Sequence, residues 1–273
     1  MAYTLAALDM DGTLLNTNHE ITPRSKAVIA RAAQAGKLVA LSTGRCLSEL
    51  REHLAAIPGI AYVIGENGAC VYDVERERVI QQIVLKDAAV ESALCAAEGL
   101  HALGQCFIDN QSYMEGGPDD RLLPYHIRDF AGVFEAGSIF VPDIGALCAA
   151  HRGHIEKINL YFSNGGDRDA FLKRIQGAPV ALSDSIGLGC EISPPEATKA
   201  RGLRALCDHL NLSTSRTIAV GDGGNDIDIM SAAGLSVAMA NAIPEVLALA
   251  HAITGDCDHD GAAEALERYL LEA

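Results

Sequence analysis

Asp9-Met10-Asp11-Gly12-Thr13 is the stretch that decides the fold of this 273-residue chain. It follows Tyr3-Thr4-Leu5-Ala6-Ala7-Leu8, an apolar run with the length of a β-strand. Two acids and a glycine directly after this run predict that the chain leaves the sheet at Asp9. Both carboxylates would then lie at the carboxyl end of a buried strand, which is where open α/β sheets bind their ligands.

The chemistry of these two acids indicates a metal site. Carboxylates so close together repel each other unless a cation or hydrogen bonds compensate their charge. Hard oxygen ligands of this kind suit Mg²⁺. The alternative is an ordinary surface turn, because Asp and Gly are common turn residues. Three later motifs argue against that alternative.

The composition is that of a folded chain with an acidic balance. Apolar residues make up 49% and charged residues 21%, which favours a substantial core over disorder. The net charge of -15 argues against a nucleic-acid partner, which would require a basic surface. An anionic substrate remains compatible with this charge, because a bound metal can invert the local potential.

The cysteines and the apolar runs indicate the compartment. The eight cysteines are scattered without a C-x-x-C spacing, which predicts buried thiols in a reducing environment. Asp9 and Asp11 interrupt the first apolar run, and no run reaches transmembrane length. We therefore expect a cytoplasmic protein with no membrane partner. The sequence does not indicate the oligomeric state.

The order of the elements predicts a doubly wound parallel sheet. Thr22-Pro23 is typical of a helix start, and an apolar strand follows at residues 38–42. Strand, helix and strand form a βαβ unit, so residues 3–8 and 38–42 are expected to be parallel neighbours. Residues 70–83 favour a hairpin, and the alternation of strands and helices resumes at residue 198.

The middle of the chain has a different pattern of helix and strand signals, which predicts a second domain. From Lys86 to Cys190 the helix and strand signals are mixed and less regular. One helix expected there runs from Asp119 to Phe130, although it contains Pro124. We expect residues 1–84 and 190–273 to form an α/β core, with residues 85–189 inserted as an α+β cap.

Four motifs resemble those of the haloacid dehalogenase (HAD) superfamily. They are Asp9-Met10-Asp11-Gly12-Thr13, Ser42-Thr43-Gly44-Arg45, Lys199 and Gly221-Asp222-Gly223-Gly224-Asn225-Asp226. Their order and separation resemble the Cof-type phosphatases, which carry a large α+β cap between the second and third motifs. The similarity extends to Glu66-Asn67-Gly68-Ala69, Ala238-Met239-Ala240-Asn241-Ala242 and Asp260-Gly261-Ala262-Ala263. It implies a Rossmann-like core, with the active site between core and cap.

The two acids of the first motif suit different catalytic roles. A carboxylate can act as a nucleophile and pass through an aspartyl-phosphate. Asp9, at the strand end, is held more rigidly and is the better nucleophile. Asp11 suits proton transfer to the leaving oxygen and later from water. The resemblance assigns the same roles and implies that the Asp11 backbone carbonyl helps to bind Mg²⁺.

The second and third motifs are candidates for binding the substrate phosphate. Thr43 and Gly44 offer a hydroxyl and an exposed N–H before a helix start, which can cradle a phosphate or simply cap the helix. The resemblance favours phosphate binding, with Arg45 contacting either the substrate or the cap. The resemblance also implies that Lys199 neutralises the phosphate and the nucleophile, with Arg201 as a minor rival for that role.

The fourth motif supplies further acids at the end of another apolar run. Asp222 is the natural second carboxylate for Mg²⁺, joining Asp9. The resemblance places Asn225 at the substrate phosphate and Asp226 at the metal, where they complete or orient its shell. The segment lacks the final glycine of a dinucleotide loop, and the chain contains no P-loop motif.

These residues predict Mg²⁺-dependent hydrolysis of a small phosphate monoester through an aspartyl-phosphate. The resemblance implies sugar phosphates or phosphorylated cofactors as substrates. One alternative is a phosphotransferase or phosphomutase on the same scaffold, and another is a non-catalytic module that binds phosphate or Mg²⁺.

A separate pattern near the end of the chain matches a calcium-binding loop. Asp256, Asp258 and Asp260-Gly261, with Glu267 further on, satisfy the spacing of an EF-hand. The alternative is a plain loop leading into the last helix, with Asp260 near the N-terminus of that helix. We expect the plain loop, because Ile253-Thr254 before it is typical of a strand end rather than a helix end.

Overall fold

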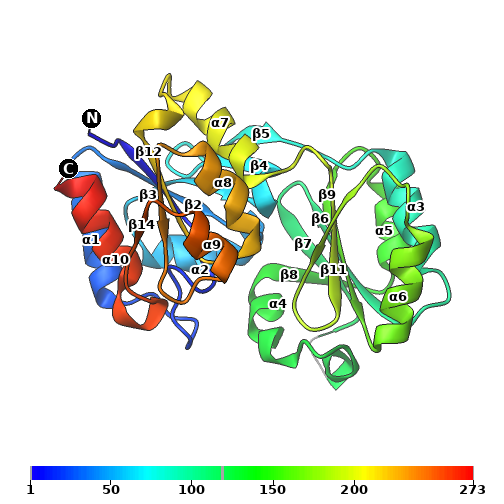
Figure 1. Cartoon of the computed structure of the whole chain (residues 1–273). Helices are drawn as coiled ribbons and strands as arrows, with labels where there is room; N and C mark the ends of the chain where they lie inside the picture. Colours follow the sequence, from blue (N-terminus) through cyan, green and yellow to red (C-terminus); the bar gives the residue numbers. More distant parts are fainter. Residues whose placement is uncertain (1, 118–119, 273) are drawn as a thin grey trace. The chain divides into compact units, whose positions relative to one another are not determined.

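The computed structural model describes residues 2–117 and 120–272, which divide into two compact units (Figure 1). The first unit contains the chain up to residue 45, residues 52–82, and the chain from residue 197 onward. The second unit contains residues 46–51 and 83–196. An α/β unit interrupted by a second unit is the fold class that the sequence predicts, and that prediction is confirmed.

The first unit is built on an eight-stranded sheet in the order β14-β13-β12-β1-β2-β3-β4-β5. The strands from β14 to β3 are parallel, and β4 and β5 continue the sheet as an antiparallel hairpin. Their bounds are β1 Leu5–Leu8, β2 Leu38–Ser42, β3 Ile60–Gly65, β4 Cys70–Asp73, β5 Arg78–Gln82, β12 Thr217–Gly221, β13 Leu235–Ala238 and β14 Ala252–Ile253. The carboxyl end of β1 therefore lies between those of β2 and β12, as expected for the βαβ unit.

Helices cover both faces of this sheet, which explains why β1 is apolar along its whole length. Leu5 and Ala7 pack with α7 (Lys199–His209), α8 (Ile227–Ala232) and α9 (Pro244–Leu249). Residues alternate along a strand, so Ala6 and Leu8 face the opposite side. On that side α1 (Pro23–Gln34) packs against α10 (Gly261–Ala265) and its π-helical extension Leu266–Leu271 (Figure 1).

The predicted start of α1 is confirmed in atomic detail. Thr22 has extended backbone, and its hydroxyl accepts a hydrogen bond from the N–H of Ser25 at 3.1 Å. Pro23 occupies the first turn, where its missing N–H leaves no unmet hydrogen bond. The next helix along the chain, α2, runs from Leu47 to Ala56.

The second unit is a six-stranded sheet with helices on both faces, three on one and a short one on the other (Figure 1). The strand order is β10-β11-β9-β6-β7-β8, antiparallel except for the β7–β8 pair. The strands are β6 Ala102–Ile108, β7 Gln111–Glu115, β8 Ser138–Val141, β9 Ile155–Phe162, β10 Ala181–Asp184 and β11 Gly189–Ser193. The helices α3 (Asp87–Ala97), α5 (Ile144–Ala150) and α6 (Gly165–Arg174) bury an apolar core against this sheet, and α4 is Ala131–Gly137.

The single helix predicted from Asp119 to Phe130 is wrong. Asp119 lies outside the described residues, and the remainder forms two separate 3-10 turns, Asp120–Tyr125 and Arg128–Phe130. Pro124 cannot donate a helical hydrogen bond, and His126 takes a left-handed conformation with φ 59°. Both features interrupt a continuous α-helix. No helix in the described part of the chain has the length and hydropathy of a membrane span.

The close packing of α7 on β3 generates a test of this core. A Cβ on Gly202 would lie 2.4 Å from the Ile64 Cγ2 atom and 3.2 Å from the Gly68 Cα atom. Alanine is the better helix former by about 1 kcal/mol, but overpacking of a core costs about 1–3 kcal/mol. We expect Gly202→Ala to lower the melting temperature in a thermal denaturation experiment.

The control for this substitution is Gly132→Ala in α4. That position is also helical, and a Cβ there would meet no atom within 4 Å. Equal melting temperatures for Gly202→Ala and the parent would contradict the tight contact between α7 and β3.

Candidate active site

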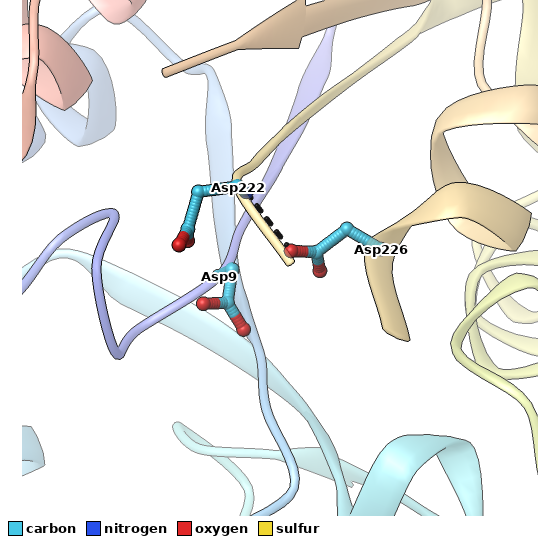
Figure 2. A group of neighbouring side chains, drawn as sticks. All are labelled: Asp9, Asp222 and Asp226. Atoms are coloured by element: carbon cyan, nitrogen blue, oxygen red, sulfur yellow. Dashed lines mark hydrogen bonds between the residues drawn. The ribbon is translucent and has the colours of Figure 1, made fainter. Parts of the chain in front are cut away.

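Three aspartates gather at the carboxyl ends of β1 and β12 (Figure 2). Asp9 directly follows β1, Asp222 directly follows β12, and Asp226 closes the short turn Gly224–Asp226. One carboxylate oxygen of each lies within 4.8 Å of the others. Among residues 2–117 and 120–272 no other cluster of three or more acidic, histidine or cysteine side chains has this geometry.

A buried lysine ties two of these carboxylates together. Lys199 is the first residue of α7, and only 1% of its surface is exposed. Its Nζ donates to Asp9 Oδ1 at 2.6 Å and to Asp226 Oδ1 at 2.7 Å. Arg201, two residues further on, is exposed, so Lys199 is the cation that the fold brings to the carboxylates.

Asp226 also organises the loop that carries Asp222. Its Oδ2 accepts hydrogen bonds from the backbone N–H groups of Asp222 and Gly223, both at 3.1 Å (Figure 2 draws the first). Both oxygens of Asp226 therefore already accept protein donors. Gly221 has to be glycine here, because a Cβ would lie 2.4 Å from the Asp226 Cγ atom.

Burial makes the negative charge of this cluster costly. Burial, with the nearby charge of Asp226, raises the pKa of Asp9 well above its ordinary value, although Lys199 opposes this shift. Burial likewise raises the pKa of Asp222 to about 6, although the hydrogen bond from Thr13 lowers it in part. Burial disfavours the charge of Lys199, but its two carboxylate partners outweigh this and raise its pKa.

The donor set fits a divalent cation. Two carboxylates contact one ammonium group and a third lies close to both, so the cluster carries an excess of negative charge in a largely buried place. A cation of charge +2 would offset this excess, and carboxylate oxygens are the ligands that Mg²⁺ prefers. Asp9 and Asp222 are the members best placed to hold it, since Asp226 would have to give up a bond to the protein.

The residues after Asp11 hold the Asp222 carboxylate in place. Thr13 Oγ1 donates to Asp222 Oδ1 at 2.8 Å. Gly12 has φ 82°, and a Cβ there would lie 2.5 Å from Asp222 Oδ2. Asn241, three residues after β13, donates from Nδ2 to the Gly12 carbonyl at 2.8 Å. The sequence alone assigns no role to Thr13 or Asn241, although each is a polar residue in a loop that follows a strand of the sheet.

Asp11 and Arg45 form an ion pair beside the cluster. Arg45 Nη2 lies 2.5 Å from Asp11 Oδ1, and Arg45 Nε donates to Asp11 Oδ2 at 3.1 Å. The Asp11 side chain is 48% exposed, whereas that of Arg45 is only 12% exposed. Burial, followed by the charge of Arg45, lowers the pKa of nearby His53. The fold thus pairs Arg45 with the proposed proton-transfer residue.

Thr43 and Gly44 lie at the carboxyl end of β2, next to Asp9 on the neighbouring strand. Thr43 is buried, and its hydroxyl accepts a hydrogen bond from the N–H of Arg45 at 3.2 Å. Asn225 reaches toward the same region, where its Nδ2 donates to Asn67 Oδ1 at 3.3 Å. The residues predicted to bind the substrate phosphate therefore surround the same strand ends as the carboxylates.

The carboxylates of the calcium-like pattern do not gather around a common point. Asp258 accepts the N–H and hydroxyl of Thr17, and Asp256 accepts the backbone N–H groups of residues 258 and 259. Glu267 pairs instead with two arginines of α1. These carboxylates thus serve contacts within the loop and with residues 17–31, which agrees with a plain loop leading into α10.

Comparisons with known proteins match nearly the whole chain. The sequence model of the haloacid dehalogenase-like hydrolases matches residues 6–266. HMP-PP phosphatase of Citrobacter koseri is 30% identical, over 97% of this chain and 95% of that protein. Phosphatase YwpJ of Bacillus subtilis is 26% identical, over 97% of this chain and 99% of that protein.

Solved structures share the fold. A haloacid dehalogenase-like hydrolase from B. subtilis superposes with a TM-score of 0.85 at 26% identity, covering 97% of this chain and 99% of that one. A subclass IIB sugar phosphatase superposes with a TM-score of 0.79 over 97% of this chain and 98% of that one. At 21% identity, this second likeness shows the fold alone.

The raised pKa of Asp222 predicts how stability depends on pH without metal. Its folded pKa of about 6 exceeds the ordinary value of about 3.9, so the folded state binds more protons between these values. We expect the free energy of unfolding, measured by urea denaturation in EDTA, to fall as pH rises through that window. Asp222→Asn should reduce this slope.

Added Mg²⁺ gives the complementary measurement. The cation needs ionised carboxylates, so it should raise the melting temperature more at about pH 7.5 than at about pH 5. The Asp222→Asn variant should show little of this rise. An identical pH slope in parent and variant, or a rise with Mg²⁺ that both share, would contradict the assignment.

The plain-loop interpretation of residues 256–267 predicts no calcium effect through Asp258. We expect a Ca²⁺ titration to shift the melting temperature equally in the parent and in Asp258→Ala. A calcium stabilisation that the parent shows and the variant loses would establish a site that this geometry does not indicate.

Proposed function

Because the chain belongs to the haloacid dehalogenase-like hydrolases, we propose that it hydrolyses small phosphate monoesters with Mg²⁺ through an aspartyl-phosphate. The observation that supports this most directly is the setting of Asp9. Its carboxylate stands at the end of the central strand β1, bound to Lys199 and beside Asp222. A positioned carboxylate with adjacent positive charge is what phosphoryl transfer to an enzyme requires.

Asp9 is the proposed nucleophile of the first step. Its carboxylate oxygen forms a bond to phosphorus while the bond from phosphorus to the ester oxygen breaks. Asp11 donates a proton to that departing oxygen, so that an alcohol leaves. Lys199, held in place by Asp226, neutralises charge on Asp9 and on the phosphoryl oxygens. Thr43, Gly44 and Asn225 hold those oxygens.

Water completes the cycle in the second step. Asp11, now a carboxylate, takes a proton from the water as its oxygen bonds to phosphorus. The bond between phosphorus and the Asp9 oxygen breaks, which releases inorganic phosphate and restores Asp9. The contact with Arg45 supports Asp11 in this role, because it fixes the carboxylate on the solvent side of the cluster.

Mg²⁺, when bound, would neutralise the phosphoryl oxygens as charge develops on them. We propose Asp9 and Asp222 as its side-chain ligands, together with the Asp11 backbone carbonyl. In this arrangement Asp226 does not contact the metal ion. It orients Lys199 and the loop that carries Asp222.

The substrate class is proposed by analogy with relatives. The similar proteins include an HMP-PP phosphatase. The first compounds to test are HMP-PP and the two classes that the resemblance of the motifs implies, sugar phosphates and phosphorylated cofactors. We expect the second unit to select among them. On the face opposite α3, α5 and α6, its sheet carries a buried polar group in which Gln105 Oε1 accepts from Asn159 Nδ2 at 3.0 Å and from the Tyr161 hydroxyl at 2.6 Å.

The separate roles of Asp9 and Asp11 can be tested by varying the leaving group. Asp9→Asn should abolish turnover of every ester. Asp11→Asn should lose about 10² to 10⁴ in rate on a sugar phosphate, which needs a proton on its leaving oxygen. The loss in the first step should be much smaller for p-nitrophenyl phosphate, whose leaving group is stable as an anion. Rapid-quench measurement of the p-nitrophenolate burst reports that step.

Four outcomes would contradict parts of this scheme. A burst from Asp9→Asn would exclude Asp9 as the nucleophile. Equal first-step losses for Asp11→Asn on aryl and alkyl esters would exclude Asp11 as the acid. Transfer of phosphate to an added sugar phosphate in place of water would favour the phosphotransferase alternative. Full activity in excess EDTA would contradict the proposed requirement for Mg²⁺.

A further inference from the structure

The turn Glu66–Gly68, directly after β3, is strained and has no part in the scheme above. Glu66 and Asn67 both have φ 53°, and Gly68 has φ 97°. Left-handed backbone is costly for residues other than glycine, and such strain persists only where surrounding contacts impose it. Two consecutive strained residues beside a candidate active site indicate that the turn places something there.

The backbone of this turn is fastened to two elements of the site. The Glu66 N–H donates to the Arg45 carbonyl, and the Asn67 N–H donates to the Thr43 carbonyl, both at 3.0 Å. Gly68 abuts the start of α7 so closely that a Cβ would lie 2.0 Å from the Thr198 carbonyl oxygen. The turn therefore connects the loop after β2 to the helix that begins with Lys199.

The side chain of Asn67 reaches a third element. Its Oδ1 accepts the Asn225 Nδ2 hydrogen bond at 3.3 Å. The same amide lies over Gly44, where its Oδ1 and Nδ2 are 3.4 and 3.5 Å from the position of a Cβ on that glycine. One amide group thus lies beside both Gly44 and Asn225, two of the residues proposed to bind the phosphate.

The hydrogen bond also determines which way the Asn225 amide faces. An asparagine side chain has one acceptor oxygen and one NH₂ group with two hydrogens. Because Asn67 Oδ1 can only accept, Asn225 must turn its NH₂ toward it. The NH₂ group carries a second hydrogen, which an anionic ligand can accept.

We propose that Asn67 is a positioning residue for the phosphoryl group of the substrate. It orients the Asn225 amide as a donor and supports the Thr43–Gly44 backbone, and it does so without bonding to the reacting atoms. The inference rests on the proposed phosphatase function, because the site it serves is the phosphate site of that reaction.

Asn67→Gly is the sharpest test, because glycine keeps the left-handed backbone and removes only the amide. We expect KM for p-nitrophenyl phosphate and the Kd of inorganic phosphate to rise about threefold to tenfold, the loss of one hydrogen bond. Little change is expected in kcat or in melting temperature. Asn211→Gly is the matched control, because Asn211 is also left-handed (φ 51°) and lies after the far end of α7.

A double-mutant cycle with Asn225→Ala tests whether Asn67 affects phosphate binding through Asn225. Because Asn67 acts chiefly through Asn225 in this proposal, Asn67→Gly should weaken phosphate binding much less in the Asn225→Ala background than in the parent. Fully additive losses would overturn the proposal, as would a parental phosphate Kd in Asn67→Gly. Loss of phosphate binding in Asn211→Gly as well would also overturn it.

Failure of this inference is distinguishable from failure of the proposed function. Calorimetric titration with inorganic phosphate measures binding without turnover. If the parent binds phosphate but hydrolyses no ester, the proposed function is rejected, and the role of Asn67 in phosphate binding can still be measured. An active parent that Asn67→Gly matches in every constant would reject the role of Asn67 alone.

Discussion

The site depends on one buried ammonium group held between two carboxylates. Lys199 is 1% exposed, so its charge is tolerable only because Asp9 and Asp226 both contact it. These three residues come from β1, from the start of α7 and from the turn after β12. The ion pairs form only when all three elements are in place, which links the chemistry of the site to completion of the core.

Steric constraints act at the same strand ends. Gly12, Gly68, Gly202 and Gly221 each stand where an added Cβ would fall within 2.5 Å of a neighbouring atom. The neighbours include Asp222, Asp226 and the backbone at Thr198, all parts of the site or of its support. These glycines allow the carboxylates, the lysine helix and the Glu66–Gly68 turn to approach one another more closely than side chains would permit.

The sequence was informative where local chemistry and strand order act together. An acid directly after each of two apolar runs was enough to predict Asp9 and Asp222 at strand ends, and the structure brings these side chains together. The predicted parallel neighbours β1 and β2 and the hairpin after β3 are likewise present. The helix predicted across Pro124 is wrong, because 3-10 turns and a left-handed His126 lie there.

The sequence by itself determined the fold class and which acids stand at strand ends, because these follow from periodicity and turn chemistry. Its four motifs indicated the family through their resemblance to known ones. Only the tertiary structure decided the partners of Arg45, Thr13, Asn67 and Asn241. Arg45 pairs with Asp11 and Asn67 with Asn225 through contacts between segments far apart in the chain. No local pattern encodes such pairs, because they depend on strand order and on how closely neighbouring loops approach at the carboxyl edge of the sheet.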